Sequence, residues 1–183
     1  MAKPELTKQL IAEKLKELML KTHLDKISVQ DIVRACGLNR KTFYYHFKDK
    51  QELVCWIFDH EFANLRDLDQ NNTIIDELIE RLYENKDFYV AALTSDAQNN
   101  LREHLFEIIY EAIINRIIEI LGTRRMALED MKIIANYFSN AVVGCITQWA
   151  REGMKASPFE YSIDFHPITQ ECLKFIIDKY IKE

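Results

Sequence analysis

The fold of this chain is decided by residues 27–58, ISVQDIVRACGLNRKTFYYHFKDKQELVCWIF. Ser28 followed by Asp31 has the form of a capping box, in which each side chain accepts a hydrogen bond from the other residue's backbone N–H. We therefore expect a helix to begin at Val29. Gly37 interrupts the pattern where a tight turn needs a residue without a Cβ atom. The first helix of this stretch should therefore be short.

Two further helices are expected after that turn. Asn39 is a favourable N-cap for a second short helix from Arg40 to about Phe47. Asp49 can cap a third helix, which enters an apolar run that contains Leu53. A helix, a glycine-containing turn and a second helix form the layout of a helix-turn-helix DNA-binding motif.

The second of these short helices has two different faces. Phe43 and Phe47 fall on one side at helical spacing and should pack on the preceding helix. The other side and its flanks carry polar or aromatic side chains: Lys41, Thr42, Tyr44 and Tyr45. Hydroxyl groups and a cation on one face suit a helix that lies in a major groove, where they reach bases and phosphates. The alternative is a pair of exposed tyrosines on an ordinary surface helix.

The run SVQDIVRACGLNRKTFYYHFKDKQEL resembles the signature of the TetR family of bacterial transcription regulators. The residues that carry the resemblance are Cys36, Gly37, Thr42, Phe43, Tyr44, His46, Phe47 and Lys50. They lie within about the first third of the chain. The resemblance implies an all-α protein with an N-terminal three-helix DNA-binding domain, followed by a larger helical domain for effector binding and dimerisation. Because the apolar pattern enters the third helix near Asp49, we place the two domains at residues 1–50 and 51–183.

The same resemblance implies roles for individual residues. Those implied to face base edges are Arg40, Lys41, Thr42 and Tyr45, and those implied to hold phosphates are Tyr44, His46 and Lys50. Ser28, at the start of the preceding helix, completes the predicted DNA-binding set. The bases that these residues read do not follow from the sequence.

The net charge of −5 hides an asymmetry between the two predicted domains. Residues 1–50 carry a charge of +5 and residues 51–183 a charge of −10. A basic segment joined to an acidic body is the distribution expected when only one end of a protein meets a polyanion. It argues against general coating of nucleic acid by the whole surface.

The remaining composition favours a helical, globular, cytoplasmic protein. The chain is 48% hydrophobic, with four Gly and three Pro, and it has no signal peptide and no run of eighteen apolar residues, so no membrane contact is expected. The four cysteines have no metal-type spacing and should be reduced thiols: Cys36, Cys55, Cys145 and Cys172. A redox or zinc sensor is the alternative to that interpretation.

The apolar pattern predicts the other helices. They run over about residues 6–21, 49–68, 73–83, 87–94, 99–121, 128–151 and 168–181, with a turn at Asn71-Asn72 and a Pro-bounded loop over 157–167. The helix over 49–68 leaves the first domain without a flexible linker, so it can carry a displacement between the domains. The helix over 99–121 is apolar on most sides and is expected to be buried at the centre of the second domain.

The family resemblance also implies the partners. We expect a homodimer that pairs the helices over 128–151 and 168–181, and that binds a double-stranded DNA operator with an inverted repeat. An unidentified small-molecule effector is expected among aromatic positions that are also ordinary core residues: Phe62, Phe88, Tyr89, Phe106, Tyr110, Tyr137 and Trp149. The main interpretation is a repressor released by this effector.

Two other interpretations stay open. The run TFYYHFKDKQELVCWIF is similar to a branch of the family that activates dihydroxyacetone kinase operons, which favours a second domain that docks a protein co-regulator. A helical-bundle metal sensor or enzyme would need His60, His104 and Glu107 to come together. No phosphate-binding loop, nucleophile elbow or ligand-type Cys/His pairing is present. We therefore expect no catalytic residue, no metal site and no cofactor.

Overall fold

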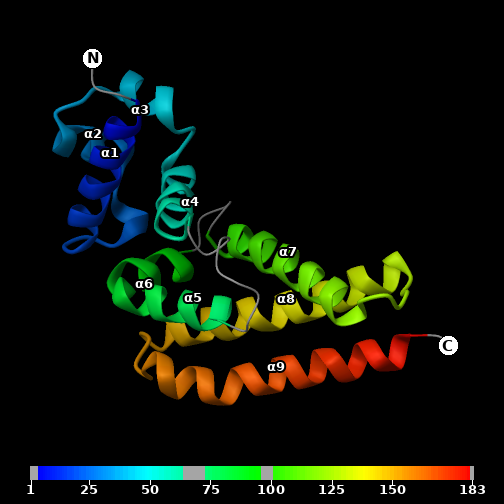
Figure 1. Ribbon diagram of the computed structural model, residues 1–183. Coiled ribbons are helices and arrows are strands. Elements are labelled where there is room, and N and C mark those ends of the chain that lie inside the picture. Colours follow the sequence, from blue (N-terminus) through cyan, green and yellow to red (C-terminus); the bar gives the residue numbers. More distant parts are fainter. Residues whose placement is uncertain (1–3, 64–72, 96–100, 182–183) are drawn as a thin grey trace.

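A computed structural model describes residues 4–63, 73–95 and 101–181 of the chain (Figure 1). These residues form helices and no strand, which confirms the predicted all-α fold. The elements are α1 (Pro4–Met19), the short 3-10 helix η1 (Leu24–Lys26), α2 (Val29–Cys36), α3 (Arg40–His46), α4 (Lys50–Glu61), α5 (Thr73–Glu84), α6 (Lys86–Thr94), α7 (Leu101–Leu121), α8 (Leu128–Arg151) and α9 (Pro158–Tyr180).

Helices α1 to α3 form a head at one end of the molecule, and α4 runs from this head toward the larger bundle (Figure 1). The expected capping box is present at α2, where Ser28 and Asp31 exchange side-chain-to-backbone hydrogen bonds. Gly37 ends α2 with a left-handed φ of 66°, a conformation that favours a residue without a Cβ atom. The helix-turn-helix geometry therefore follows from local signals in the sequence.

Helix α4 is shorter than the sequence predicts. It ends at Glu61 rather than near Leu68, although residues 64–72, which include the predicted turn at Asn71-Asn72, lie outside the described part of the chain. The carbonyl of Glu61 accepts a hydrogen bond of 2.8 Å from Nη1 of Arg81. The ring of the next residue, Phe62, is buried and stacks on Phe58 at a centroid distance of 4.2 Å. Contacts from α5 and the core thus end a helix whose apolar pattern continues.

Helix α9 begins ten residues before the predicted start at Ile168, so the expected loop over 157–167 is wrong. A second capping box explains the difference, because the Ser157 side chain accepts from the backbone of Glu160 while Glu160 accepts from the backbone of Ser157. Pro158 occupies the first turn, where its missing N–H costs nothing. The helix then continues through Pro167.

The bundle is organised around α7 and α8, which pack along each other, while α9 lies against α5, α7 and α8 (Figure 1). The buried side of α7 is a single stripe at helical spacing: Leu101, Leu105, Ile109, Ile113, Ile117 and Leu121. Ile118, on another side, is half exposed. The helix expected at the centre of the second domain thus packs against α8, α9, α4 and α6, while its apolar side chains outside the stripe are partly or half exposed.

Candidate nucleic-acid interface

Helix α3 presents the face that the sequence assigned to DNA. The Asn39 side chain caps its first turn by accepting from the backbone N–H of Thr42 at 2.9 Å. Phe43 is fully buried and packs edge-on against the ring of Tyr44 at a centroid distance of 5.5 Å. On the outer side, Tyr45 is 79% exposed and Tyr44 is 48% exposed. Burial of Phe43 thus fixes the helix and leaves both tyrosines facing solvent.

Two of the predicted DNA-binding residues, Arg40 and Tyr44, contact each other. Nη2 of Arg40 donates to the hydroxyl of Tyr44 at 3.2 Å, and the guanidinium lies 5.7 Å from the Tyr44 ring centroid. The residues are one helical turn apart, so their side chains meet on one surface of α3. The i, i+4 spacing is visible in the sequence and could have revealed this pair. It restricts the guanidinium before any ligand arrives.

The capping box at the start of α2 contains Ser28, another residue predicted to bind DNA. Ser28 is exposed, and its hydroxyl donates to Oδ2 of Asp31 at 2.6 Å. Side-chain and backbone hydrogen bonds from Ser28 lower the pKa of the Asp31 carboxyl below its ordinary value. Asp31 therefore stays ionised at neutral pH and holds the first turn of α2 in place.

His46 ends α3 in a positively charged neighbourhood. Partial burial and, secondarily, the nearby Lys8 lower the pKa of His46 below its ordinary value. The Lys8 ammonium lies 5.9 Å from the Phe47 ring centroid and 5.7 Å from that of Trp56. His46 is therefore mostly neutral at pH 7, where one ring nitrogen donates and the other accepts.

Lys50 is placed differently from the other predicted phosphate ligands. Its ammonium donates to the carbonyl of Leu24 and, at 2.7 Å, to the carbonyl of Ile27. Burial lowers its pKa below the ordinary value. Lys50 thus closes the loop between α1 and α2. The remaining members of the predicted set, Lys41 and Thr42, lie on α3 together with the tyrosines.

The predicted effector residues lie in separate groups of aromatic contacts. Phe62, Phe88 and Tyr89 are buried between α4 and α6, with ring centroids 5.0 to 5.8 Å apart for the Phe88–Tyr89 and Phe62–Tyr89 pairs. Phe106 and Tyr110 stack on each other along α7. The other two positions, Tyr137 and Trp149, lie on α8. Among the described residues this set is therefore distributed over at least three places.

The two predicted effector residues on α8 have opposite environments. Trp149 is buried, stacks on Tyr161 at 4.7 Å and donates through Nε1 to the carbonyl of Ala156 at 3.1 Å. Tyr137 is 67% exposed. Trp149 thus joins α8 to α9 as part of the core, whereas Tyr137 belongs to the surface.

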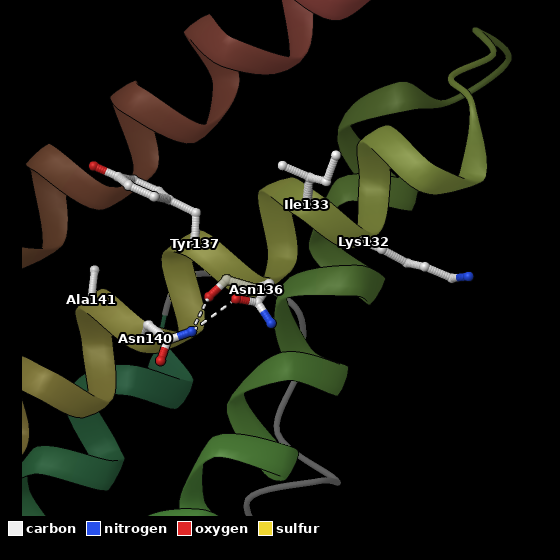
Figure 2. Close-up of a pocket in the computed structure, with 6 residues that line it drawn as sticks. All are labelled: Lys132, Ile133, Asn136, Tyr137, Asn140 and Ala141. Carbon is white, nitrogen blue, oxygen red and sulfur yellow. Dashed lines mark hydrogen bonds between the residues drawn. The ribbon is translucent and has the colours of Figure 1, made fainter.

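Tyr137 lines a hollow along α8 (Figure 2). Among the residues whose side chains are described, its lining comes from α8: Lys132, Ile133, Asn136, Tyr137, Asn140 and Ala141. Nδ2 of Asn140 donates to the carbonyl and to Oδ1 of Asn136, at 2.8 and 2.9 Å. Tyr137 and Ile133 project from the same side of the helix (Figure 2).

The two histidines named for the metal alternative each have other partners. Nε2 of His104 lies 2.7 Å from Oδ1 of Asp59. His60 stacks on Trp56, and its Nδ1 lies 3.9 Å from a carboxylate oxygen of Glu5. Within residues 4–63, 73–95 and 101–181 no group of three or more ligating side chains is suited to a metal ion. Over the same ranges no helix is long and apolar enough to cross a membrane.

Two family models match the chain. Residues 11–55 match the model described as "Bacterial regulatory proteins, tetR family", and residues 69–171 match the model described as "Transcriptional regulator C-terminal region". The second match alone covers more than half of the chain. Together they span the helix-turn-helix and most of the helical bundle.

A relative of known function is also a transcription regulator. The chain is 33% identical over 124 residues to the HTH-type dhaKLM operon transcriptional activator DhaS of Lactococcus lactis subsp. lactis. That segment covers 64% of this chain and 64% of the relative, so the match spans less than two thirds of the relative's length.

Two solved structures show the same fold. The dihydroxyacetone kinase operon activator DhaS has a TM-score of 0.66 at 22% identity and covers 96% of this chain and 98% of its own. NalD, the secondary repressor of the MexAB-OprM multidrug efflux pump in Pseudomonas aeruginosa, has a TM-score of 0.57 at 16% identity and covers 97% of this chain and 96% of its own.

A helix-turn-helix head on a helical bundle, with these matches at both ends, defines a transcription regulator. The chain belongs to the TetR family of bacterial transcription regulators.

Proposed function

We propose that this regulator is a homodimer that binds an inverted-repeat DNA operator through the outer face of α3. The observation that carries the proposal is the exposed face around Tyr45 on a helix whose opposite side is locked into the core by Phe43. Arg40, Lys41 and Thr42 read base edges with Tyr45. Phosphates are bound by Ser28, at the start of α2, and by Tyr44 and His46.

Dimerisation is supported by apolar surface on the last two helices. Ile133 and Tyr137 on α8 are 60% and 67% exposed, and Phe175 on α9 is 63% exposed. Exposed apolar side chains gathered on two neighbouring helices are typical of a subunit interface. Pairing α8 and α9 of two copies would cover them, and two α3 helices about 34 Å apart would match the spacing of successive major grooves.

The second domain receives the signal. In the main form of the proposal, a small molecule binds among the bundle helices and releases a repressor from its operator. The second form is an activator whose bundle docks a protein co-regulator. The description of the DhaS relative as an operon activator favours it, as does the distribution of the predicted effector residues over separate places. Neither form uses catalytic turnover or a metal, and both act in the cytoplasm.

Selection of DNA from a random-sequence pool by the wild-type protein tests the proposal directly. We expect a short inverted repeat to be enriched, protected in footprinting as two half-sites, and bound by a particle with the mass of a dimer. Equal affinity for the selected and for shuffled DNA at moderate salt would overturn it.

The two forms of signalling differ in their partners. Calorimetry with candidate metabolites, with and without operator DNA, should show affinities that differ by a factor of about 5–150 if a small molecule is the signal. A stable complex with a co-regulator, and no response to metabolites, supports the second form. A reporter gene driven by the operator gives the sign of regulation.

A further inference from the structure

Glu61, the last residue of α4, touches three other helices. Its carboxylate accepts a hydrogen bond from the hydroxyl of Tyr89 on α6 and pairs with the ammonium of Lys16 on α1. Its carbonyl accepts from Arg81 on α5 at 2.8 Å. Residue 61 therefore joins one helix of the DNA-binding head to two helices of the bundle.

The side chains that contact the Glu61 carboxylate are held by contacts of their own. The Tyr89 ring is fully buried, and burial together with the Glu61 charge raises the pKa of its phenol far above the ordinary value. The phenol therefore stays protonated, and its O–H donates a hydrogen bond to the Glu61 carboxylate. The Lys16 ammonium also lies 5.3 Å from the ring centroid of Phe88, which borders the same site.

The backbone side of the junction is equally constrained. Arg81 donates through Nε to Oε1 of Glu77 at 2.6 Å, and its guanidinium lies 5.9 Å from the ring centroid of Phe62. The contact with Glu77, one turn earlier in α5, therefore orients the guanidinium that donates to the Glu61 carbonyl. A hydrogen bond of 2.6 Å from the Ser95 hydroxyl to Oδ1 of Asp25 ties the end of α6 to η1 of the head as well.

We propose that Glu61 is a positioning residue for operator recognition. Through Lys16 and Tyr89 it sets the angle of the DNA-binding head on the bundle, and so the separation of the two α3 helices in the dimer. The inference rests on the proposed dimeric DNA binding. Helix α4 is 12 residues long, about 18 Å, so a rotation of about 10° at Glu61 moves its other end by about 3 Å. Groove spacing tolerates little error of this kind.

The test compares Glu61→Gln with Glu17→Gln. Both changes remove one negative charge from a Lys–Glu pair, but Glu17 pairs with Lys14 within α1, at 2.8 Å. The DNA ligands are the inverted repeat selected by the wild-type protein and versions with one to three base pairs inserted or deleted between the half-sites. The readout is affinity as a function of half-site spacing.

We expect the wild-type protein and Glu17→Gln to share a steep preference for the selected spacing. Glu61→Gln should lose about tenfold in affinity at that spacing and lose less at the altered ones, which gives a flatter profile. A merely structural loss of stability would lower affinity at every spacing by the same factor. Parallel profiles for Glu61→Gln and Glu17→Gln would overturn the inference.

Tyr89→Phe is the second variant, because it removes only the hydroxyl and keeps the buried ring and the charge. It should flatten the spacing profile in the same direction, and it keeps the inference testable if Glu61→Gln does not fold. An unchanged profile in Tyr89→Phe would count against the hydroxyl's part in the junction. If the wild-type protein selects no inverted repeat, the proposed function fails; if it does and only the profiles coincide, the positioning role fails alone.

Discussion

The head and the bundle, which α4 connects, are held together in different ways. In the head, α2 and α3 have eight and seven residues, and each is fixed by a side-chain cap and by one or two buried residues. In the bundle, α7 and α8 have 21 and 24 residues, and the N-cap of α8, Ala127, makes no side-chain cap hydrogen bond. Short helices are marginal without caps, whereas long ones gain stability from an apolar stripe packed on a neighbour.

The exposed surfaces of the head and the bundle also differ in chemical character. The head exposes tyrosines with hydroxyl groups next to cations, and the bundle exposes aliphatic and aromatic carbon on α8 and α9. The first suits a hydrated polyanion and the second suits a copy of the same surface. A local motif thus makes the surface that we propose reads DNA, and packing between distant segments makes the surface that we propose for assembly.

The largest expected effect separates the two faces of α3. Phe43→Ala removes a fully buried ring and should lower the free energy of unfolding by about 3–5 kcal/mol. Tyr45→Ala, on the exposed face, should change it by less than about 0.5 kcal/mol while operator affinity falls. Urea unfolding and gel-shift titration measure the two quantities. Equal stability losses would show that α3 is not buried on the Phe43 side.

The second largest effect is expected from charged substitutions in the exposed apolar surface of α8, compared with the same kind of substitution in the head. Ile133→Asp with Tyr137→Asp should give monomers, and operator affinity should fall by about 100-fold or more because the second half-site contact is lost. Leu20→Asp alters an equally exposed apolar residue at the end of α1 and should leave a dimer. Light scattering at micromolar concentration gives the masses. A dimeric double variant would move the interface away from α8.

The two capping boxes give a smaller, matched comparison. Ser28→Ala and Ser157→Ala should each lower the free energy of unfolding by about 1 kcal/mol. Only Ser28→Ala should also weaken operator binding, because Ser28 lies on the predicted DNA face. The measurement is operator affinity at a temperature where both variants are fully folded. Equal affinities would remove Ser28 from the interface.

The smallest expected effect is a dependence on pH. Because the pKa of His46 in the free protein is below its ordinary value, His46 is neutral at pH 7.5 and gains a proton only as the pH falls through that lowered pKa. The added charge faces phosphates, so operator affinity should rise a few-fold on acidification. His46→Gln should lose this part of the rise, while the other four histidines act alike in both proteins. Identical pH profiles would contradict a phosphate contact by His46.

The DNA-binding head could be predicted almost completely from the sequence. The caps at Ser28 and Asn39, the turn at Gly37 and the burial of Phe43 all depend on residues within a few positions of one another. Local hydrogen bonds and helical spacing decide such features, and both can be read along the chain. Lys50 is the exception, since the carbonyls that it reaches are 23 and 26 residues away.

In the bundle the sequence alone determined that the helices exist, and tertiary structure decided where they end and what they surround. Helix α4 ends at Glu61, whose carbonyl accepts from Arg81, 20 residues later, and whose carboxylate accepts from Tyr89, 28 residues later. The aromatic residues expected around one effector are spread over separate contacts. Periodicity along one helix shows which side is apolar. It does not show which distant helix will cover that side, because that depends on the packing of all the helices together.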